Sequence, residues 1–549
     1  MSKNPPQKQS QAISIIIERQ YIFTPIFFVA AIVLLFLIGI FLWRYILRPQ
    51  PLADILSVEN TAAYAQTSID PQNPQTNLFL NMTSRYPFLN KRYFIGKLED
   101  FTGMNFEENI KPWFGKSIGI ALITDESNSH GAEPVIFAET KSKSEAKKFL
   151  QKMAIKFKSD YPQENKYKKF TIYTYRFSQD FAFTFIGYYL VGTENIEAME
   201  NFLDTISDDF TAISSIKEYK EANKDYFDLS LAHAYINPQL LMESAMLSYN
   251  SSEEQKYLIS NLEPIINIFK NLFIRLETKN GYLKLKDTTI LKSAFPRNEE
   301  KYIAELAEYM PPNIALFYGG LDITRQILSL GRPIKNIIDI QTKSVLGDSI
   351  SFEKDIFPLL TEEYALGIKE NGSVVFAFKA KDPIMTEQKL KTMMIALKRS
   401  PLMLKTKIVE VELPNGEKQK ESIEAANIVI SSETDYRGFK IYGTKTENAE
   451  WGIYYTLIDK TVLIGSTENV IKNAIDAFTA KESFMFSDEF KTFIKPLIKN
   501  SDEIFYLSAD KYFNVLSGIS EYLRPVATIA AGRKYDGFNV KTVYYILTK

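Results

Sequence analysis

Two stretches of the sequence, LVGTENI at residues 190–196 and LIGSTENV at residues 463–470, carry the same motif twice. Each begins as a short apolar run, typical of a buried strand, and continues into a helical pattern of apolar residues. The glycine in each, Gly192 or Gly465, permits a tight turn from strand to helix. The letters TEN after it supply side-chain oxygens that cap free N–H groups at a helix start. The motif therefore predicts a strand–turn–helix unit in each half of the chain.

Four further pairs of short stretches recur in the same order. They are NTAAYA at 60–65 with NIALFY at 313–318, FEENIKP at 106–112 with FEKDIFP at 352–358, PVIFA at 134–138 with SVVFA at 373–377, and NGY at 280–282 with DGF at 536–538. Matches in one conserved order, spaced by about 250 residues, indicate a tandem duplication of a domain and not a solenoid of short repeats. We therefore predict sister domains at residues 55–295 and 306–549.

Local patterns predict the same elements within each copy. In the first copy, 117–123 and 135–138 are short apolar runs that predict a hairpin, and 144–157 has helical spacing. A final hairpin is predicted at the NG turn of residues 280–281, and its counterpart at DGF in the second copy. Strands joined by short turns pair antiparallel. We predict an α+β fold in which each domain is a mainly antiparallel sheet with helices on one face.

The two copies differ mainly at Arg399–Tyr436, which is longer than the equivalent stretch of the first copy. Within it, the pattern predicts a strand at Thr406–Leu413 and a charged loop at Gly416–Glu424.

The N-terminal region contains an uncharged apolar segment from Tyr21 to Trp43. Its length suffices for a helix to cross a hydrocarbon core of about 30 Å. Aromatic rings at its ends favour the membrane interface, and Arg19 and Arg44 close it off. A core helix of this length would show a polar face. A cleaved signal peptide would place small residues directly after a shorter apolar run, and Trp43-Arg44 follows instead. The segment predicts an uncleaved transmembrane anchor.

The basic residues beside this segment set its predicted orientation. The tail 1–20 carries Lys3, Lys8 and Arg19, and the linker 44–54 carries Arg44 and Arg48. Lysine and arginine favour the cytoplasmic side. We expect a cytoplasmic tail, the helix at 21–43, the linker, and a large extracytoplasmic region.

Composition narrows the classes of function. A net charge of −1 gives no concentrated basic face for nucleic acid. The chain has no cysteine and only His130 and His233, which disfavours zinc sites and nucleophilic triads. His233 lies in an apolar run and is interpreted as a core or edge residue. We predict no catalytic residues, no cofactor and no metal site.

Several smaller motifs favour a structural interpretation. The GKS of residues 115–117 lacks the earlier glycine and the following helix of a phosphate-binding loop. Acidic neighbours such as Glu362 and Glu363 point apart on a strand, so a solvated surface is the better interpretation. Trp113 and Trp451 are more simply packed under a sheet than stacked on a ligand.

This ordered set of motifs resembles a bacterial family of envelope proteins that is catalogued as domain of unknown function thirty-three fifty-two. The family's proline–tryptophan–glycine motif stands here as KPWFG at residues 111–115, whereas the second copy departs from it with PLL at 358–360. The resemblance covers most of residues 55–549. It implies an envelope location and carries no activity or functional residue.

These observations favour a single-pass, non-enzymatic binding or assembly module of the cell envelope. The expected partners are the membrane and an envelope protein or apolar ligand, without nucleic acid. A carrier of lipid or another apolar ligand is the first alternative, because aromatic-rich strands can enclose an apolar cavity. An envelope hydrolase is the second, and clustered carboxylates with shifted pKa values in a cleft would favour it.

Overall fold

The computed structural model of the chain describes residues 51–70, 72–84, 86, 91–124, 131–157, 163–176, 180–206, 209–223, 230–247, 262–296, 300–329, 332–398, 404–412, 418–426, 429–447, 449–513 and 525–548. The chain divides into two compact units, Met1–Asp54 and Ile55–Lys549. Of the first unit, only the end of the predicted linker is described, and it contains the short helix η2 (Leu52–Asp54). All the elements that follow belong to the second unit.

The first half of this unit contains ten strands and interspersed helices among its described residues. In chain order they are β1 (Thr61–Ser68), α2 (Pro74–Thr83), α3 (Lys91–Thr102), η4 (Phe106–Ile110), β2 (Phe114–Ile123), β3 (Glu133–Thr140), α4 (Lys143–Lys156), β4 (Gln163–Tyr167), β5 (Phe170–Arg176), β6 (Asp180–Ile186), β7 (Tyr189–Thr193), α5 (Ile196–Thr205), η5 (Ile213–Ser215), α6 (Lys217–Ala222), β8 (Ala232–Ile236), α7 (Pro238–Leu247), β9 (Phe269–Lys279) and β10 (Tyr282–Phe295).

The second half follows a similar order. It contains η6 (Glu305–Tyr309), β11 (Ile314–Leu321), α9 (Ile323–Ser329), α10 (Arg332–Leu346), η7 (Phe352–Ile356), η8 (Phe357–Leu359), β12 (Glu363–Lys369), β13 (Val374–Lys379), α11 (Pro383–Leu397), β14 (Leu404–Glu412), β15 (Lys418–Ala426), β16 (Val429–Tyr436), β17 (Phe439–Thr446), β18 (Gly452–Ile458), β19 (Thr461–Gly465), α12 (Glu468–Ala480), η10 (Phe484–Phe486), η11 (Phe490–Ile494), α13 (Lys495–Ile498), β20 (Glu503–Ser508), α14 (Ala509–Phe513) and β21 (Val526–Thr548).

One antiparallel sheet of 19 strands runs through the described part of this unit. In the first half its order is β4-β5-β6-β7-β3-β2-β1-β8-β9-β10. In the second half it is β16-β17-β18-β19-β13-β12-β11-β20-β21. The predicted α+β class with mainly antiparallel pairing is confirmed. Both predicted sister domains lie within the single unit Ile55–Lys549. The boundary between them stays a prediction.

The repeated motifs take matching conformations. η4 and η7 are both π-helical turns, and each is capped by the preceding side chain: Asn105 accepts from the Glu108 N–H, and Ser351 accepts from the Lys354 N–H. The LVGTENI and LIGSTENV motifs each give a strand followed by a helix, as predicted.

Helices cover both faces of the sheet, so the prediction of helices on one face is wrong. In β13, Val375 and Ala377 belong to the core cluster that contains α12, whereas Phe378 belongs to the cluster that contains Leu390 of α11. Successive side chains of a strand point to opposite faces. Both faces of these strands are apolar, so each face is shielded from water by its own helix.

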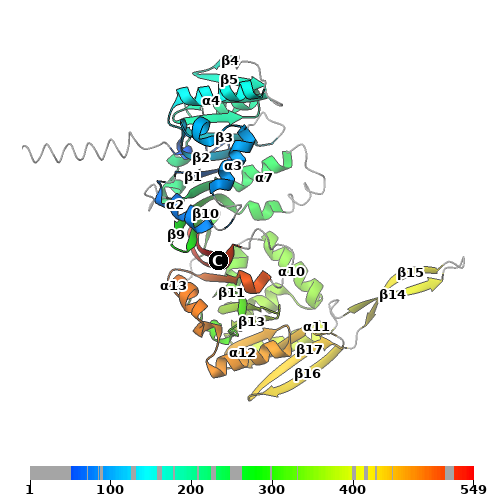
Figure 1. Cartoon of the computed structure of the whole chain (residues 1–549). Coiled ribbons are helices and arrows are strands. Elements are labelled where there is room, and N and C mark those ends of the chain that lie inside the picture. The colour runs from blue at the N-terminus through cyan, green and yellow to red at the C-terminus, as the bar shows by residue number, and fades with distance from the viewer. Residues whose placement is uncertain are drawn as a thin grey trace, which may run out of the picture. The chain divides into compact units, whose positions relative to one another are not determined.

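The second predicted terminal hairpin does not form. In the first half, β9 and β10 pair through the turn at Gly281, where φ is +85°. In the second half, Gly537 also has a positive φ, of +62°, but β21 continues past it and pairs with β10 of the first half (Figure 1). The edge of β10 offers free backbone groups to β21, and this pairing joins the halves into one sheet.

The inserted stretch of the second half forms a separate two-stranded ribbon, β14 and β15 (Figure 1). The predicted strand at Thr406–Leu413 is confirmed with shifted bounds. The predicted charged loop at Gly416–Glu424 is wrong over much of its length, because Lys418–Ala426 is a strand that pairs with β14. Cross-strand pairing overrides the low strand propensity of its Lys and Glu residues.

Candidate functional site

The candidate site lies where β21 of the second half meets β10 of the first. Backbone pairing runs from Tyr282 opposite Leu547 to Phe295 opposite Gly537. The rings of Phe295 and Tyr535 stack across this junction with centroids 4.0 Å apart. The junction brings polar and charged side chains from both halves next to one another.

A cavity of about 200 Å³ opens on one side of this junction. Its wall comes from β1, α6 and the segment after it, β8, β9, β10 and β21. The lining residues are Tyr64, Tyr219, Glu221, Ala222, Asn223, His233, Ala234, Phe273, Ile274, Arg275, Lys286, Asp287, Thr288, Lys541, Thr542 and Val543. Aromatic rings and charged groups both contribute, and the volume is below the roughly 300–1,000 Å³ of typical ligand sites.

Two of the basic side chains that line the cavity, Arg275 and Lys286, share one buried carboxylate, Glu277. Arg275 lies 3.0 Å from Glu277, and Lys286 lies 3.3 Å from the same carboxylate. Arg275 and Lys286 are opposite each other in the β9–β10 pairing, so both point to one face of the sheet. Glu277 therefore neutralises much of the positive charge that these two strands bring to the cavity.

His233 lies in the wall of this cavity, and not only in the core or at an edge as interpreted from the sequence. It is opposite Arg275 in the β8–β9 pairing, and its ring meets Tyr64 edge-on at 5.8 Å. Burial, with a smaller contribution from the charge of Arg275, lowers the pKa of His233 to about 4. The imidazole is therefore neutral at pH 7.

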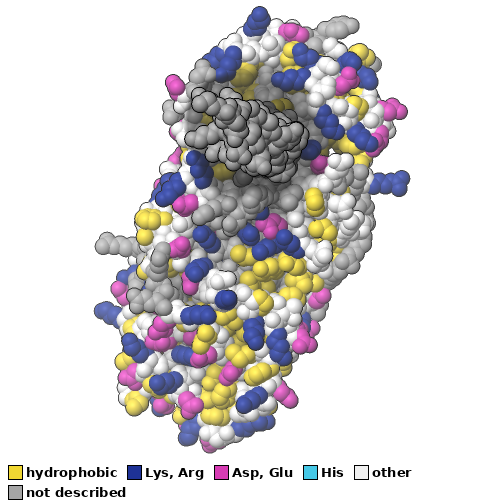
Figure 2. Space-filling model, turned by 90° about the vertical axis from the view of Figure 1, so that its left-hand side faces the viewer, with side chains coloured by type: hydrophobic (Ala, Val, Ile, Leu, Met, Phe, Trp, Pro, Cys, Tyr) yellow, Lys and Arg dark blue, Asp and Glu magenta, His cyan; other side chains and the backbone are white. Residues whose placement is uncertain are grey.

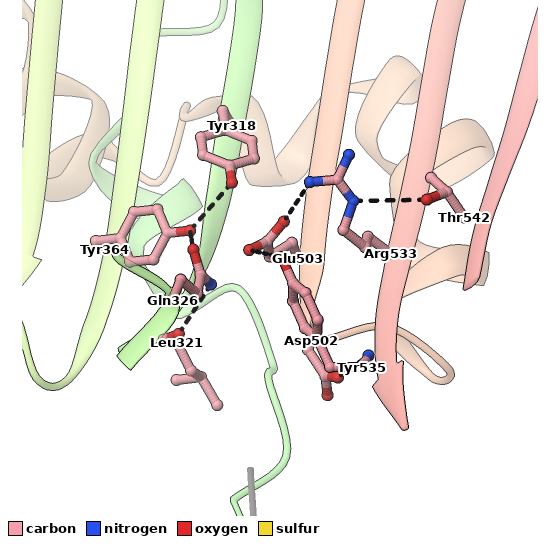
Figure 3. A network of polar contacts seen from close by, with 9 residues as sticks. All are labelled: Tyr318, Leu321, Gln326, Tyr364, Asp502, Glu503, Arg533, Tyr535 and Thr542. Atoms are coloured by element: carbon pink, nitrogen blue, oxygen red, sulfur yellow. Dashed lines mark hydrogen bonds and ion pairs between the residues drawn. The ribbon is translucent and has the colours of Figure 1, made fainter. Parts of the chain in front are cut away.

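A second polar cluster centres on Glu503 at the start of β20 (Figure 3). Only 2% of Glu503 is exposed. The Tyr535 hydroxyl donates to its carboxylate at 2.8 Å, and the Arg533 guanidinium lies 3.4 Å away. Arg533 also donates to the Thr542 hydroxyl at 3.5 Å, which links this cluster to the junction.

Two tyrosines, Tyr318 and Tyr364, lie on the side of Glu503 that faces away from Arg533 in Figure 3. The Tyr364 hydroxyl donates to Tyr318 at 3.3 Å and lies 3.2 Å from the side-chain oxygen of Gln326. Burial raises the pKa of both tyrosines, and the charge of Glu503 raises it further. They are neutral hydrogen-bonding groups, unable to act as bases near pH 7.

The two buried carboxylates, Glu503 and Asp287, differ in whether a ligand could reach them. Burial raises the pKa of Glu503 and of Asp287, and the charge of Arg533 opposes this in both. Glu503 is sealed, and both of its oxygens have partners, so its role is structural. Asp287 borders the cavity, where a ligand group could reach it. No group of His, Cys, Asp and Glu residues suited to a metal ion occurs in the described ranges.

The residues predicted to anchor the chain in a membrane lie outside the described residues. They are Tyr21, Trp43, Arg19 and Arg44. Within the part of the chain that the structure covers, no helix combines the length and the apolar character needed to cross a membrane. The anchor therefore stays a prediction.

The smaller motifs divide between core and surface. Trp113 is buried between Phe114 and Phe149 as predicted, whereas Trp451 is 47% exposed. The GKS of residues 115–117 lies within β2, where no helix start follows it. The interpretation of Glu363 as solvated is wrong: it is 3% exposed, accepts from the Leu306 N–H and pairs with Lys379 at 3.2 Å.

Sequence reasoning missed both polar clusters of the junction. The period-2 pattern of the predicted β9–β10 hairpin would have placed Arg275 and Lys286 on one face. No local signal marks Glu503 as buried, because its partner strand and Tyr318 come from distant parts of the chain.

Known proteins resemble the chain as follows. The family model described as "Protein of unknown function (DUF3352)" matches residues 28–409 and 415–540. No curated protein matches. Crystal form III of TP0453 is similar at 10% identity over 47% of this chain and 84% of that one, with a TM-score of 0.25. Crystal form I of TP0453 has 11% identity over 47% and 82%, with a TM-score of 0.24. TM-scores this low do not establish a shared fold.

Proposed function

The chain belongs to the DUF3352 family of proteins of unknown function, and we propose that it is a non-enzymatic binding or assembly module of the cell envelope. In this proposal Tyr21–Trp43 anchors it in the membrane, with residues 1–20 in the cytoplasm and the rest outside. Two duplicated halves form the extracytoplasmic region.

The observation that carries the proposal is the pairing of β10 with β21. A main-chain ladder, reinforced by the Phe295–Tyr535 stack, makes both halves parts of one sheet. Such a connection resists the hinge motion by which two-domain enzymes close on substrates. A stiff double-length sheet suits a scaffold that presents fixed surfaces to partners.

The membrane topology can be tested with single cysteines, because the chain has none of its own. Trp451→Cys places a thiol at a position that is 47% exposed in the second half. An impermeant maleimide should label it in intact spheroplasts. Lys8→Cys is the matched cytoplasmic control and should be labelled only after lysis. Labelling of position 8 but not position 451 in intact spheroplasts would reverse the proposed orientation.

The absence of catalysis is tested on the purified full chain. We expect no turnover of cell-wall or phosphoester substrates. Asp287 is the residue that an envelope hydrolase would most plausibly use, because it borders the cavity and burial raises its pKa. Turnover that Asp287→Asn abolishes and Asp536→Asn leaves intact would establish the hydrolase instead.

An apolar-ligand carrier is the second candidate, and one observation favours it. Ile120 and Ile136 face each other across β2 and β3 and are 46% and 52% exposed. An apolar ligand could cover this part of the sheet, whereas the junction cavity of about 200 Å³ is small for an acyl chain. Saturable binding of a fluorescent fatty acid that Ile136→Asp abolishes, and Ile430→Asp does not, would support the carrier.

A further inference from the structure

Helix α4 presents an unusually basic outer surface. Basic and acidic side chains are interspersed on the face of the molecule in Figure 2, as the net charge of −1 leads one to expect. α4 contains one acidic residue, Glu145, against five exposed lysines: Lys143, Lys147, Lys148, Lys152 and Lys156. Glu145 pairs with Lys148 at 2.7 Å, yet 62% of the Lys148 side chain remains exposed.

The packing of α4 determines which of its faces is exposed to solvent. Its apolar stripe of Ala146, Phe149, Leu150 and Ala154 is buried in the core cluster of the first half. Residues three and four positions apart lie on one side of a helix, so Lys148, Lys152 and Ile155 lie on the side opposite this stripe. Lys143 and Lys147 border the stripe, with their ammonium groups 5.9 Å and 4.7 Å from the ring centroids of Phe185 and Tyr173. On the adjacent turn η4, Glu107 pairs with Lys111 and Glu108 is exposed, which offsets part of the positive charge.

Apolar side chains stand among these lysines. Ile155 is 72% exposed and Phe157, directly after the helix, is 46% exposed. A surface helix gains nothing from exposing such groups to water. Lysines beside exposed aliphatic and aromatic groups are the pattern of helices that lie at a lipid interface.

The corresponding helix of the second half lacks the lysine stripe. α11 and α4 align through their caps, Asp382 and Ser142, so Ile395 is equivalent to Ile155. Ile395 is also exposed, at 60%. α11 contains two lysines, Lys389 and Lys391, where α4 contains five. Lys391 pairs with Glu387 at 2.8 Å, and Lys389 lies 3.8 Å from Asp355. The apolar exposure is shared, but α11 does not carry the concentrated positive charge of α4.

We infer that the outer surface of α4 docks on the headgroups of an anionic phospholipid leaflet. The lysines meet lipid phosphates, and Ile155 and Phe157 enter the boundary with the acyl chains. Each lysine close to such a surface raises the partition about fivefold. A soluble anionic polymer would use the lysines alone, so the exposed apolar groups favour lipid. The inference goes beyond the proposed function: an anchor holds the chain at a bilayer, whereas α4 brings the first half onto it.

The experiment uses the full chain with a single introduced cysteine, since the natural chain has none. Ile155→Cys carries an environment-sensitive fluorophore, and Ile395→Cys is the matched control on α11. Both proteins are reconstituted into vesicles of phosphatidylcholine alone or with phosphatidylglycerol, each with and without nitroxide-labelled lipid. In anionic vesicles we expect several-fold stronger quenching at position 155 than at position 395, and little at either in neutral vesicles.

A charge variant tests the cause. Lys147→Gln, Lys148→Gln and Lys152→Gln together should lower the docked-to-undocked ratio by on the order of a hundredfold at low salt, and most of the quenching at position 155 should disappear. Circular dichroism of this variant checks that the fold persists.

Four results would overturn the inference. The first is no quenching at position 155 in anionic vesicles with which the chain floats, and the second is quenching at position 155 that is as strong in neutral as in anionic vesicles. The third is quenching at position 395 that is as strong as at position 155. The fourth is a fluorescence change at position 155 with soluble polyphosphate but not with vesicles. The anchor is read separately. A chain that floats only with anionic vesicles and is quenched at position 155 supports docking while contradicting the proposed anchor.

Discussion

The two halves share an order of strands but complete their sheets differently. The first half turns at Gly281 into its own strand β10, whereas the second half runs past Gly537 and completes its sheet against that same β10. The equivalent turn sequences NG and DGF thus lead to different pairings. The difference teaches that a positive-φ glycine permits a hairpin without imposing one, since the partner edge decides.

The halves also differ in what they bury beside this edge. Strands β1 and β11 carry the repeated NTAAYA and NIALFY motifs, and β8 and β20 pair with them at matching positions. On this alignment, Ala232 and its partner Leu276 in the first half correspond to Glu503 and its partner Arg533 in the second. One position along, His233 of the first half aligns with the fully buried Ile504. One half therefore keeps an ion pair where the other is apolar, and a histidine where the other has isoleucine.

The largest effect is expected from removing the buried carboxylate of the second half. Glu503→Ala leaves Tyr535 and Arg533 without their carboxylate partner. We expect a loss of about 3 kcal/mol in the free energy of unfolding. This is the lower part of the usual range, because 41% of the Arg533 side chain reaches solvent. Chemical denaturation of the full chain in detergent measures it.

The first half supplies the control for this change. Glu503→Ala combined with Arg533→Leu installs the residues that the first half has, Ala232 and Leu276. The double variant should recover to within about 1–2 kcal/mol of the natural chain, because no charge is left unpaired. A double variant as unstable as Glu503→Ala would show that the ion pair is not what the second half depends on.

The next effect concerns His233 and acid. Its pKa falls from the usual 6.5 to about 4 on folding, so between these values the unfolded chain binds a proton that the folded chain does not. Stability is therefore complete above pH 6.5 and declines as pH falls toward 4. We expect a loss of about 2 kcal/mol, less than the full shift implies, because His233 is only partly buried beside the cavity.

The His233→Gln variant isolates this term. Burial raises the pKa of Glu503 and Asp287, and raised carboxyl pKa values act in the opposite direction with pH. The informative quantity is thus the difference between natural and variant stability across the pH range. A difference that stays constant from pH 7 to about pH 4 would contradict the shifted histidine.

A smaller and equal effect is expected at the two glycines. Ideal Cβ atoms at Gly281 and Gly537 meet nothing within 4 Å, so Gly→Ala at either costs only the left-handed backbone, about 1–2 kcal/mol. Asparagine, which tolerates this conformation better, should restore part of the loss. If Gly537→Ala proved neutral while Gly281→Ala destabilised, the path of β21 past residue 537 would not need a positive φ.

The smallest effect concerns the helix caps of the repeated motif. Asn195 accepts from the Ala198 N–H at 2.7 Å, and Thr467 accepts from the Val470 N–H at 3.1 Å. Alanine at either position should cost about 1 kcal/mol, measured by the unfolding midpoint, while Asn195→Asp and Thr467→Ser should be nearly neutral. A much larger loss at one cap would mean that α5 and α12 are not equivalent.

The sequence predicted correctly those helices, turns and strands that depend on interactions between residues close together in the chain. The capped helices after LVGTENI and LIGSTENV, the NG hairpin and the strand at 404–412 all follow from periodicity, capping and turn chemistry. The cover of both faces was missed, although a continuous apolar run such as Val374–Phe378 is typical of a strand that is buried on both faces.

The candidate site was missed for a different reason. Arg275 and Lys286 belong to a predicted hairpin, but the cavity that they border needs β21, whose pairing with β10 joins distant segments. Glu363 and Glu503 look like surface carboxylates in the sequence. Only their neighbours, Lys379 for one and Arg533 for the other, explain their burial.

By itself the sequence determined the antiparallel α+β class, the repeated order of elements and the family, because periodicity, caps and glycine turns act over a few residues. It also carries the prediction of the anchor at Tyr21–Trp43. Only the tertiary structure decided that β21 would pair with β10, that both faces would be covered and that His233 would border a cavity with Arg275. Strand pairing is non-local, since any free edge can accept any strand, and burial selects among the partners.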